Sequence, residues 1–224
     1  WYQNVLATNE ALYAWMDEGF TSFASSETMQ YLFESTGNPH TGSMRGYQRL
    51  VDSGKEEPMA THADHYHTNF AYGRAAYSKG AVYLNQLRYI IGEEAFRSGM
   101  LRYHDEWKLK HPTDLDFIRL MEKESGMILD WFHEYFVHTT KTIDYGIASV
   151  EASESLAGTT QIELERIGLM PMPLDIRVEY TDGSKEEFYI PMRIMRGEKP
   201  AEHDLKRTIL EDWPWVEPSY SFTI

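Results

Sequence analysis

The first part of the chain alternates hydrophobic and polar residues with a helical period. Within residues 79–91 and again within residues 96–107, apolar side chains recur at intervals of three and four, which is typical of amphipathic helices. The apolar positions are Leu84, Leu87 and Ile91 in the first helix and Phe96, Met100, Tyr103 and Trp107 in the second. Gly92 is a suitable stop between them. The pattern therefore predicts two consecutive helices.

A start signal for a third helix follows. Thr113 and Asp116 fit a capping box, in which a hydroxyl and a carboxylate satisfy the free amides of a helix start. This helix is predicted to run to Gly126, and the aromatic-rich segment 127–138 predicts one more short helix. Segment 34–68 is polar and carries Gly, Pro, Ser and His, so we expect a long loop there.

Beyond about residue 140 the period changes from helical to two. Apolar residues alternate with polar ones on both sides of the turn sequence TDGS, which indicates a β-hairpin. The alternating positions are Leu174, Ile176, Val178 and Tyr180 before the turn, and Phe188 and Ile190 after it. Further strands are predicted around Ile162 and Leu164, and near the end at Trp213, Trp215, Tyr220 and Phe222.

These patterns predict an α+β protein with two domains. Residues 1–140 would form a helical domain, and residues 141–224 an antiparallel, β-sandwich-like domain. The chain opens on Trp1 rather than methionine and stops at Ile224 inside an alternating segment. We therefore expect a piece of a longer protein with a truncated β domain, and the sequence does not indicate its localisation.

Charge and composition narrow the partners. The 224 residues carry 35 acidic and 21 basic side chains, a net charge of −14, which disfavours binding to nucleic acid. No apolar run is long enough to predict a membrane-spanning helix. There is no cysteine, so any metal must be held by His, Asp or Glu.

The stretch WMDEGFTSF, residues 15–23, predicts a functional site at Glu18. Its neighbours Trp15, Phe20 and Phe23 indicate a helix packed on more than one side, where a carboxylate needs a metal or cation as partner. Gly19 weakens a helix by roughly 1 kcal/mol relative to alanine. A group that approaches the helix backbone closely would explain this glycine, whereas a merely solvated helix face would explain neither feature.

The same stretch resembles the W-x-x-E-G-x-x-x-[YF] segment of the gluzincin zinc aminopeptidases, the family typified by aminopeptidase N. The resemblance implies that Glu18 is the third ligand of one zinc ion. The first two ligands would be the histidines of an HExxH motif upstream, ending two positions before Trp1 by the family's spacing. The opening residues WYQN are similar to the segment that follows HExxH in the family, which supports this register.

A second block, YSKGAVYLNQLRYIIGEEAF at residues 77–96, is similar to the family's Y-x-K-G-A segment. The match makes Tyr77 the catalytic tyrosine, and Tyr72, five residues earlier, a residue that lines the substrate site. Lys79 and Gly80 belong to the same block, and a role at a helix start explains them. Weaker similarity continues through HPTDLDFIRLMEKESGMILDWF and PMPLDIRVEY, so it covers nearly the whole chain.

The resemblance implies the helical lobe of a thermolysin-like zinc peptidase followed by a β domain. The parent protein is expected to release N-terminal residues from peptides through a zinc-activated water, with Tyr77 stabilising the oxyanion. The 224-residue chain alone is expected to be inactive, because one carboxylate cannot hold zinc against water. The alternative is a non-catalytic binding or scaffold module that keeps the fold and has lost its metal.

A rival metal site is offered by THADHYH, which contains His62, His65, His67 and Asp64. Imidazoles are common zinc ligands, but this spacing fits no helical pair or familiar ligand motif, so a polar loop is the favoured interpretation. Asp114 and Asp116 flank a helix start and are interpreted as capping groups. Asp130 and Glu134 are expected on a solvated helix face.

Overall fold

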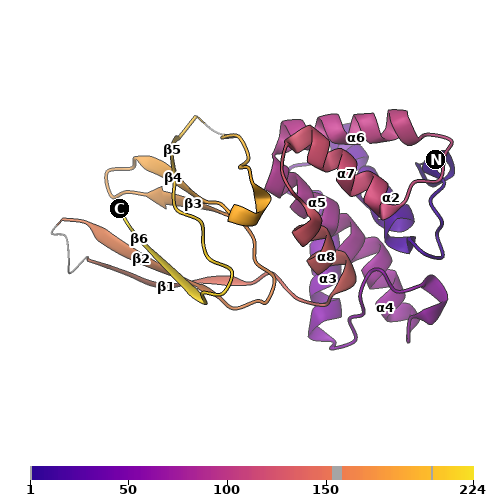
Figure 1. Ribbon diagram of the computed structural model, residues 1–224, viewed down its shortest axis with the longest axis horizontal. Helices are drawn as coiled ribbons and strands as arrows, with labels where there is room; N and C mark the ends of the chain where they lie inside the picture. The colour runs from indigo at the N-terminus through magenta and orange to yellow at the C-terminus, as the bar shows by residue number, and fades with distance from the viewer. Residues whose placement is uncertain (1, 153–157, 203) are drawn as a thin grey trace. The chain divides into compact units, whose positions relative to one another are not determined.

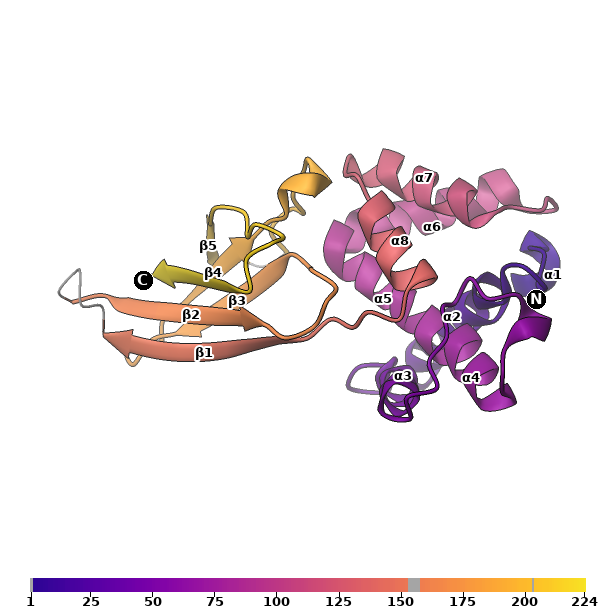
Figure 2. The ribbon, with the colours of Figure 1, turned by 60° about the horizontal axis from the view of Figure 1, so that its bottom comes forward.

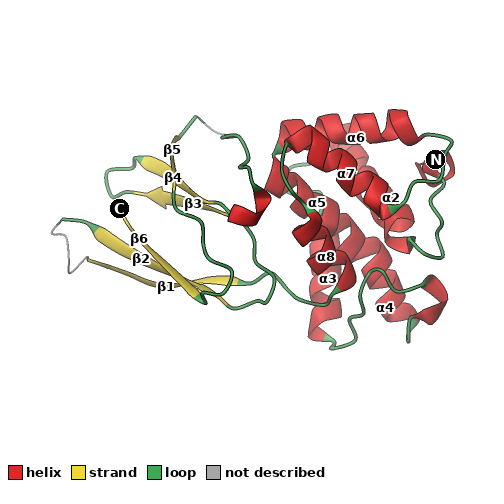
Figure 3. Ribbon diagram, in the orientation of Figure 1, coloured by secondary structure: helices red, strands yellow, loops and turns green. Residues whose placement is uncertain are grey.

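The computed structural model describes residues 2–152, 158–202 and 204–224 and divides the chain into two compact units. The first unit comprises Trp1–Thr140 and the second Lys141–Ile224. All the strands of the described residues belong to the second unit, as the yellow arrows of Figure 3 show. The α+β class predicted from the two periods is confirmed.

The first unit is built of helices (Figure 1). They are α1 Tyr2–Leu6, α2 Ala14–Phe33, α3 Thr41–Asp52, α4 Asn69–Gly73, α5 Gly80–Ile91, α6 Glu93–Trp107, α7 Asp114–Ser125 and α8 Asp130–His138. A six-residue π-helical segment, Arg74–Lys79, joins α4 to α5. Helix α7 has the predicted capping box, with Thr113 and Asp116 each bonded to the other's backbone amide. Gly92 and Gly126 adopt positive φ angles at the ends of α5 and α7.

One expectation for this unit was wrong. Segment 34–68 is not one long loop, because α3 occupies Thr41–Asp52 and buries Leu50. Its apolar positions have a helical period, but polar and glycine residues surround them. Helix α5 does begin at Gly80, preceded by Lys79, but the π-helical segment continues directly into it, and the helical backbone already starts at Asn69. Thr68 provides the cap there, its hydroxyl accepting from the Ala71 amide at 3.1 Å.

Aromatic side chains form the centre of the helical unit. Phe20 of α2 meets Phe117 of α7 edge to face, with ring centroids 4.8 Å apart. Trp15 lies five residues before Phe20 in α2, and its ring meets that of Tyr83 in α5 edge to face, with ring centroids 4.9 Å apart. Tyr83 is stacked in turn on Phe132 of α8 at 4.9 Å. Helix α2 is therefore packed on two sides, as its aromatic content predicted.

Helix α2 and the start of α5 pack against each other (Figure 2), and their backbones approach closely at two glycines. A Cβ atom added at Gly19 would lie 2.7 Å from the Gly80 Cα atom. One added at Gly80 would lie 2.9 Å from the Gly19 Cα and 3.0 Å from the Trp15 carbonyl oxygen. The group that approaches Gly19 closely is thus the backbone of Gly80, and both positions require glycine for steric reasons.

The second unit contains two three-stranded sheets, ordered β1-β2-β6 and β3-β4-β5. The strands are β1 Tyr145–Ala152, β2 Thr160–Arg166, β3 Leu174–Glu179, β4 Lys185–Ile190, β5 Lys206–Ile209 and β6 Ser219–Thr223. The predicted hairpin is β3–β4, in antiparallel register from Leu174 opposite Ile190 to Glu179 opposite Lys185. The core between the sheets is formed by Ile162, Leu164 and Phe222 from one sheet and Phe188 and Ile190 from the other, with Trp213.

Two details of the β unit differ from expectation. Strand β5 runs parallel to β4, so the second sheet is mixed rather than wholly antiparallel. Trp213 and Trp215 are not in a strand, because the last strand spans only Ser219–Thr223 and Pro214 has no amide hydrogen for a ladder. In the described part of the chain, no helix combines the length and apolar character that a bilayer crossing needs.

Candidate functional site

Glu18 lies in the second turn of α2 and is half-buried. Its Oε2 atom accepts a hydrogen bond of 2.9 Å from the side-chain amide of Gln3 in α1. The same amide donates to Oδ2 of the neighbouring Asp17, also at 2.9 Å. Helix α1 therefore presents a neutral donor to two adjacent carboxylates. The resemblance of WYQN begins at Trp1, which lies outside the described residues, whereas Gln3 of this segment contacts Glu18 directly.

The two carboxylates have no cationic side chain as an ion-pair partner within the described ranges. Burial and the negative charges of Glu18 and Glu10 raise the pKa of Asp17 to about 6, although the Gln3 hydrogen bond opposes this. Negative charge concentrated among neutral donors is an environment that a bound cation would stabilise. The local chemistry at Glu18 thus fits a metal ligand.

Tyr77 lies in the π-helical segment, three residues before Gly80. Interaction with the Glu18 carboxylate, through hydrogen bonding and its negative charge, raises the pKa of Tyr77 well above its usual value, and burial and the charges of Tyr72 and Asp17 add to this effect. The side chain is 40% exposed, so a ligand has access to it. Single-turn π-helical segments occur frequently at functional sites. The structure thus brings together the two residues that the family resemblance selected.

Tyr72 belongs to the same neighbourhood. Burial is the main reason that the pKa of Tyr72 is raised, and the negative charges of Glu18, Glu10 and Asp17 raise it further. Its ring meets that of Tyr66 edge to face, with centroids 5.6 Å apart, and it is half-buried. The Tyr72 hydroxyl is therefore within electrostatic reach of Glu18.

Lys79 has a structural role that the sequence did not reveal. Its side chain is fully buried, and Nζ donates to Glu56 Oε1 at 2.7 Å and to the Thr139 carbonyl at 3.2 Å. The ammonium also lies 5.5 Å from the ring centroid of Tyr47 and 5.3 Å from that of Phe136. This single side chain therefore links the π-helical segment that carries Tyr77 to α3, α8 and the loop after α3.

Lys79→Met is expected to destabilise the 224-residue chain by roughly 3–5 kcal/mol, because it leaves the Glu56 carboxylate buried without its counter-charge. Urea unfolding followed by circular dichroism measures the change. The double variant Lys79→Met/Glu56→Gln should recover a substantial part of the loss, and Lys108→Met, which breaks an exposed pair with Asp105, should change little. Equal effects of the buried and the exposed variant would contradict this prediction.

The rival histidines do not converge. The rings of His62 and His65 are 4.7 Å apart, but His62 Nδ1 accepts from the Asp64 amide. His67 is exposed and pairs with Glu57 at 2.8 Å. Among the described residues, these histidines are not part of any group of three ligand-type atoms within 4.8 Å of one another. Residues 63–65 form a short 3-10 turn.

A hollow of about 530 Å³ lies along another face of α2. Its lining residues are Tyr2, Val5, Thr21, Ala24, Ser25, Thr28, Met29 and His104. None of Glu18, Tyr72 and Tyr77 is among them. The residues that can do chemistry are concentrated around Glu18, Asp17 and Tyr77 rather than in this mainly apolar hollow.

Comparison with known proteins identifies the family. A model described as the peptidase family M1 domain matches residues 1–136, the segment that carries Glu18, Tyr72 and Tyr77. The match covers more than half of the 224 residues. The chain belongs to peptidase family M1, which confirms the resemblance to aminopeptidase N-like peptidases.

Curated relatives agree with this assignment. Aminopeptidase N of Escherichia coli is 25% identical over 217 residues, covering 94% of this chain and 23% of the relative. Aminopeptidase M1-B of Oryza sativa subsp. japonica is 25% identical over 131 residues, covering 56% of this chain and 15% of the relative. The chain thus spans about a quarter or less of the length of these two relatives.

Solved structures share the fold. Aminopeptidase A of Legionella pneumophila, in complex with aspartic acid, matches 97% of this chain and 22% of its own, with a TM-score of 0.55 and 14% identity. A mutant of an M1 zinc metallopeptidase from Deinococcus radiodurans, bound to a Tyr-Ser-Ala substrate, matches 62% of this chain and 30% of its own, with a TM-score of 0.50 and 18% identity.

Proposed function

We propose that the full-length protein is a zinc-dependent peptidase that removes N-terminal residues from peptides. The observation that carries this proposal is that Tyr77 interacts with the Glu18 carboxylate next to the position where two glycines bring their backbones into contact. Glu18 directly precedes Gly19, and Tyr77 lies three residues before Gly80, so both candidate residues come from the segments that meet at this contact. Membership in family M1 and the zinc metallopeptidase among its structural relatives support the choice of metal.

In this proposal Glu18 is one of three zinc ligands, and two histidines of the full-length protein supply the others. When bound, the zinc ion would polarise the scissile carbonyl and lower the pKa of a water molecule. Gln3 would orient the Glu18 carboxylate by the hydrogen bond that it already donates to Oε2. The neighbouring Asp17 shares the same amide, so Gln3 holds both acidic side chains in one arrangement.

Tyr77 would donate a hydrogen bond to the oxygen that gains negative charge as the peptide carbonyl becomes tetrahedral. Its raised pKa keeps the phenol protonated at neutral pH, which is the form that can donate. A donor already in position stabilises the developing oxyanion more than the neutral carbonyl, so it lowers the barrier. Tyr72, beside the same carboxylates, is proposed to line the substrate site.

The alternative function is a binding or scaffold module that keeps the M1 fold without a metal. Glu18 and Tyr77 argue against this alternative, because a carboxylate among neutral donors and a partly exposed tyrosine facing it add nothing evident to folding. A protein without a metal would gain nothing from keeping two adjacent carboxylates, the buried Asp17 and the half-buried Glu18, at this position.

An assay of the full-length protein tests the proposal. We expect hydrolysis of an amino-acid anilide with a free amino group and no hydrolysis of its N-acetylated counterpart. A chelator should abolish the activity, and added zinc should restore it. The 224-residue chain should be inactive under the same conditions. Chelator-resistant hydrolysis would refute the zinc mechanism, and absence of hydrolysis by the folded full-length protein would favour the scaffold alternative.

A further inference from the structure

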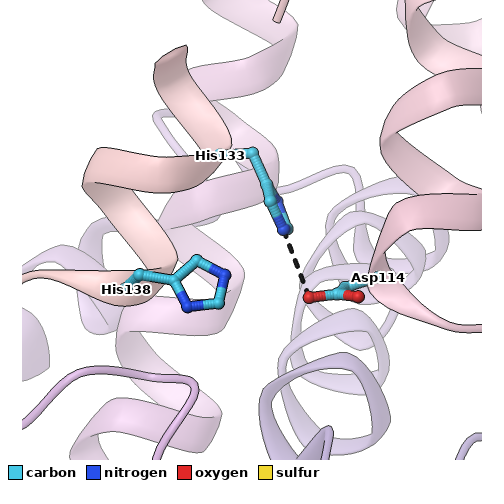
Figure 4. Close-up of side chains that lie close together, drawn as sticks. All are labelled: Asp114, His133 and His138. Carbon is cyan, nitrogen blue, oxygen red and sulfur yellow. Dashed lines mark hydrogen bonds and ion pairs between the residues drawn. The ribbon is translucent and has the colours of Figure 1, made fainter. Parts of the chain in front are cut away.

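Three potential metal ligands from α7 and α8 come together in the fold, although the sequence predicted no metal site at these residues. Asp114 is the first residue of α7, His133 lies in the first turns of α8, and His138 is its last residue. One ligand-type atom from each lies within 4.8 Å of the other two. Figure 4 shows the three side chains gathered between the two helices, with a dashed line from His133 to Asp114. The sequence indicated only a capping role for Asp114 and drew no attention to either histidine.

We propose that Asp114, His133 and His138 bind a divalent transition-metal ion of the zinc class. Two imidazoles and one carboxylate suit zinc, cobalt or nickel, whereas calcium and magnesium prefer sites made of oxygen atoms. Three protein ligands leave room for water as a fourth. The set does not include Glu18, so this proposal is independent of the proposed peptidase function.

The spacing of the first two ligands fits an ion between them. Asp114 Oδ2 lies 3.2 Å from His133 Nε2. Two atoms that each lie about 2.0–2.2 Å from one zinc ion are separated by roughly 3.3–3.6 Å in tetrahedral geometry, which is close to this spacing. Asp114 Oδ1 already accepts the Leu115 amide at 2.8 Å, which orients the carboxylate and leaves Oδ2 for the ion.

His133 is supported as metal-ligating histidines generally are. Its buried ring places Nδ1 3.2 Å from the Tyr83 hydroxyl, so Nε2 is the nitrogen that faces Asp114. A hydroxyl can accept as well as donate, so Tyr83 suits the ring with a proton on Nδ1 and a metal on Nε2. Tyr83 itself is held between Trp15 and Phe132.

His138 is the ligand that distinguishes a metal site from a simple ion pair. A buried His133–Asp114 pair is complete without it, and an ion needs it. The His138 ring centroid is 5.6 Å from that of His133, and the side chain is exposed at the end of α8. A small rotation of this unhindered side chain therefore completes the site, and the ion would tie the start of α7 to the end of α8.

Metal titration of the 224-residue chain tests the proposal. The chain is stripped with a chelator and titrated with Zn²⁺ by calorimetry and with Co²⁺ by visible absorption. We expect one ion per chain, with affinity reduced at least about tenfold in His138→Ala and in Asp114→Asn. His104→Ala, which removes another exposed histidine from the last turn of a helix, is the matched control and should bind like wild type. Circular dichroism checks that each variant is folded.

Three results would overturn the proposal. They are a folded wild-type chain that binds no ion, a His138→Ala variant that binds as tightly as wild type, and loss of binding in His62→Ala or His65→Ala instead. Glu18→Ala should leave the titration of this chain unchanged. Because the readout is binding rather than peptide hydrolysis, failure here would leave the proposed peptidase function standing.

Discussion

Glu18→Ala is expected to remove one zinc ion per chain from the full-length protein and to abolish peptide hydrolysis. The reason is that Glu18 is the only one of the three proposed ligands of this ion that the present chain supplies, and two histidines alone hold zinc too weakly to survive dialysis. Metal analysis after dialysis, together with the anilide assay, measures both losses. The two losses should coincide, since the proposed reaction depends on the ion that Glu18 binds.

Asp17→Asn is the matched control for this variant. Asp17 adjoins Glu18, accepts from the same Gln3 amide and is more deeply buried, but it has no proposed contact with zinc. The asparagine variant is expected to keep its full complement of zinc. Retention of stoichiometric zinc and activity in Glu18→Ala would show that this glutamate is not a ligand. Measuring both variants in a His138→Ala background removes any contribution from the site proposed on α7 and α8.

Tyr77→Phe is expected to retain zinc and to lower kcat about 10²–10³-fold, the usual effect of losing one oxyanion donor. Only the hydroxyl is removed, and the side chain is 40% exposed, so the fold should be unaffected. The loss should appear in kcat rather than KM, because the hydrogen bond is proposed to strengthen in the transition state. Steady-state kinetics on the free-amino anilide measures the two constants separately.

Two other tyrosine variants are the controls for Tyr77→Phe. Tyr31→Phe removes a hydroxyl from a tyrosine that is 83% exposed near the end of α2, and it should leave kcat unchanged. Tyr72→Phe, at the proposed substrate site, should act mainly on KM and by a smaller factor. If Tyr77→Phe were as active as wild type, the oxyanion donor would have to be another group.

Features that depend on a few neighbouring residues were predictable from the sequence. The capping box of α7 joins residues only three apart, so Thr113 and Asp116 revealed it directly. The β3–β4 hairpin follows from alternation around a tight turn, with Gly183 at a positive φ of 84°. The ends of α5 and α7 likewise coincide with Gly92 and Gly126.

The site was predictable only in part. Glu18 and Tyr77 came from two short blocks that resemble a family, and Tyr72 came from its spacing to the second block. The sequence also indicated that some group approaches the backbone of Gly19 closely. The sequence of either block does not predict which residues it contacts in the fold. Only the fold shows that Gly80 is the partner of Gly19 and that Gln3 donates to Glu18.

The missed elements have a common physical cause. Helix α3 has an apolar stripe with a helical period, but the segment around it is rich in polar residues and glycine, and this composition favoured a loop. Strand β5 is only four residues long and pairs with β4 in parallel. Parallel strands are not joined by a tight turn, so no turn sequence predicts this pairing. In both cases tertiary packing, rather than local propensity, stabilises the element.

By itself, the sequence determined the α+β class, most helices, the hairpin and the family, because periodicity, capping and short motifs act over a few residues. Tertiary structure alone decided which distant residues meet. The Lys79–Glu56 pair spans 23 positions, and the His133–Asp114 pair spans 19. Such contacts depend on how helices pack, and buried polar groups must find partners wherever packing places them. The Glu18–Tyr77 contact and the proposed second metal site are therefore properties of the fold.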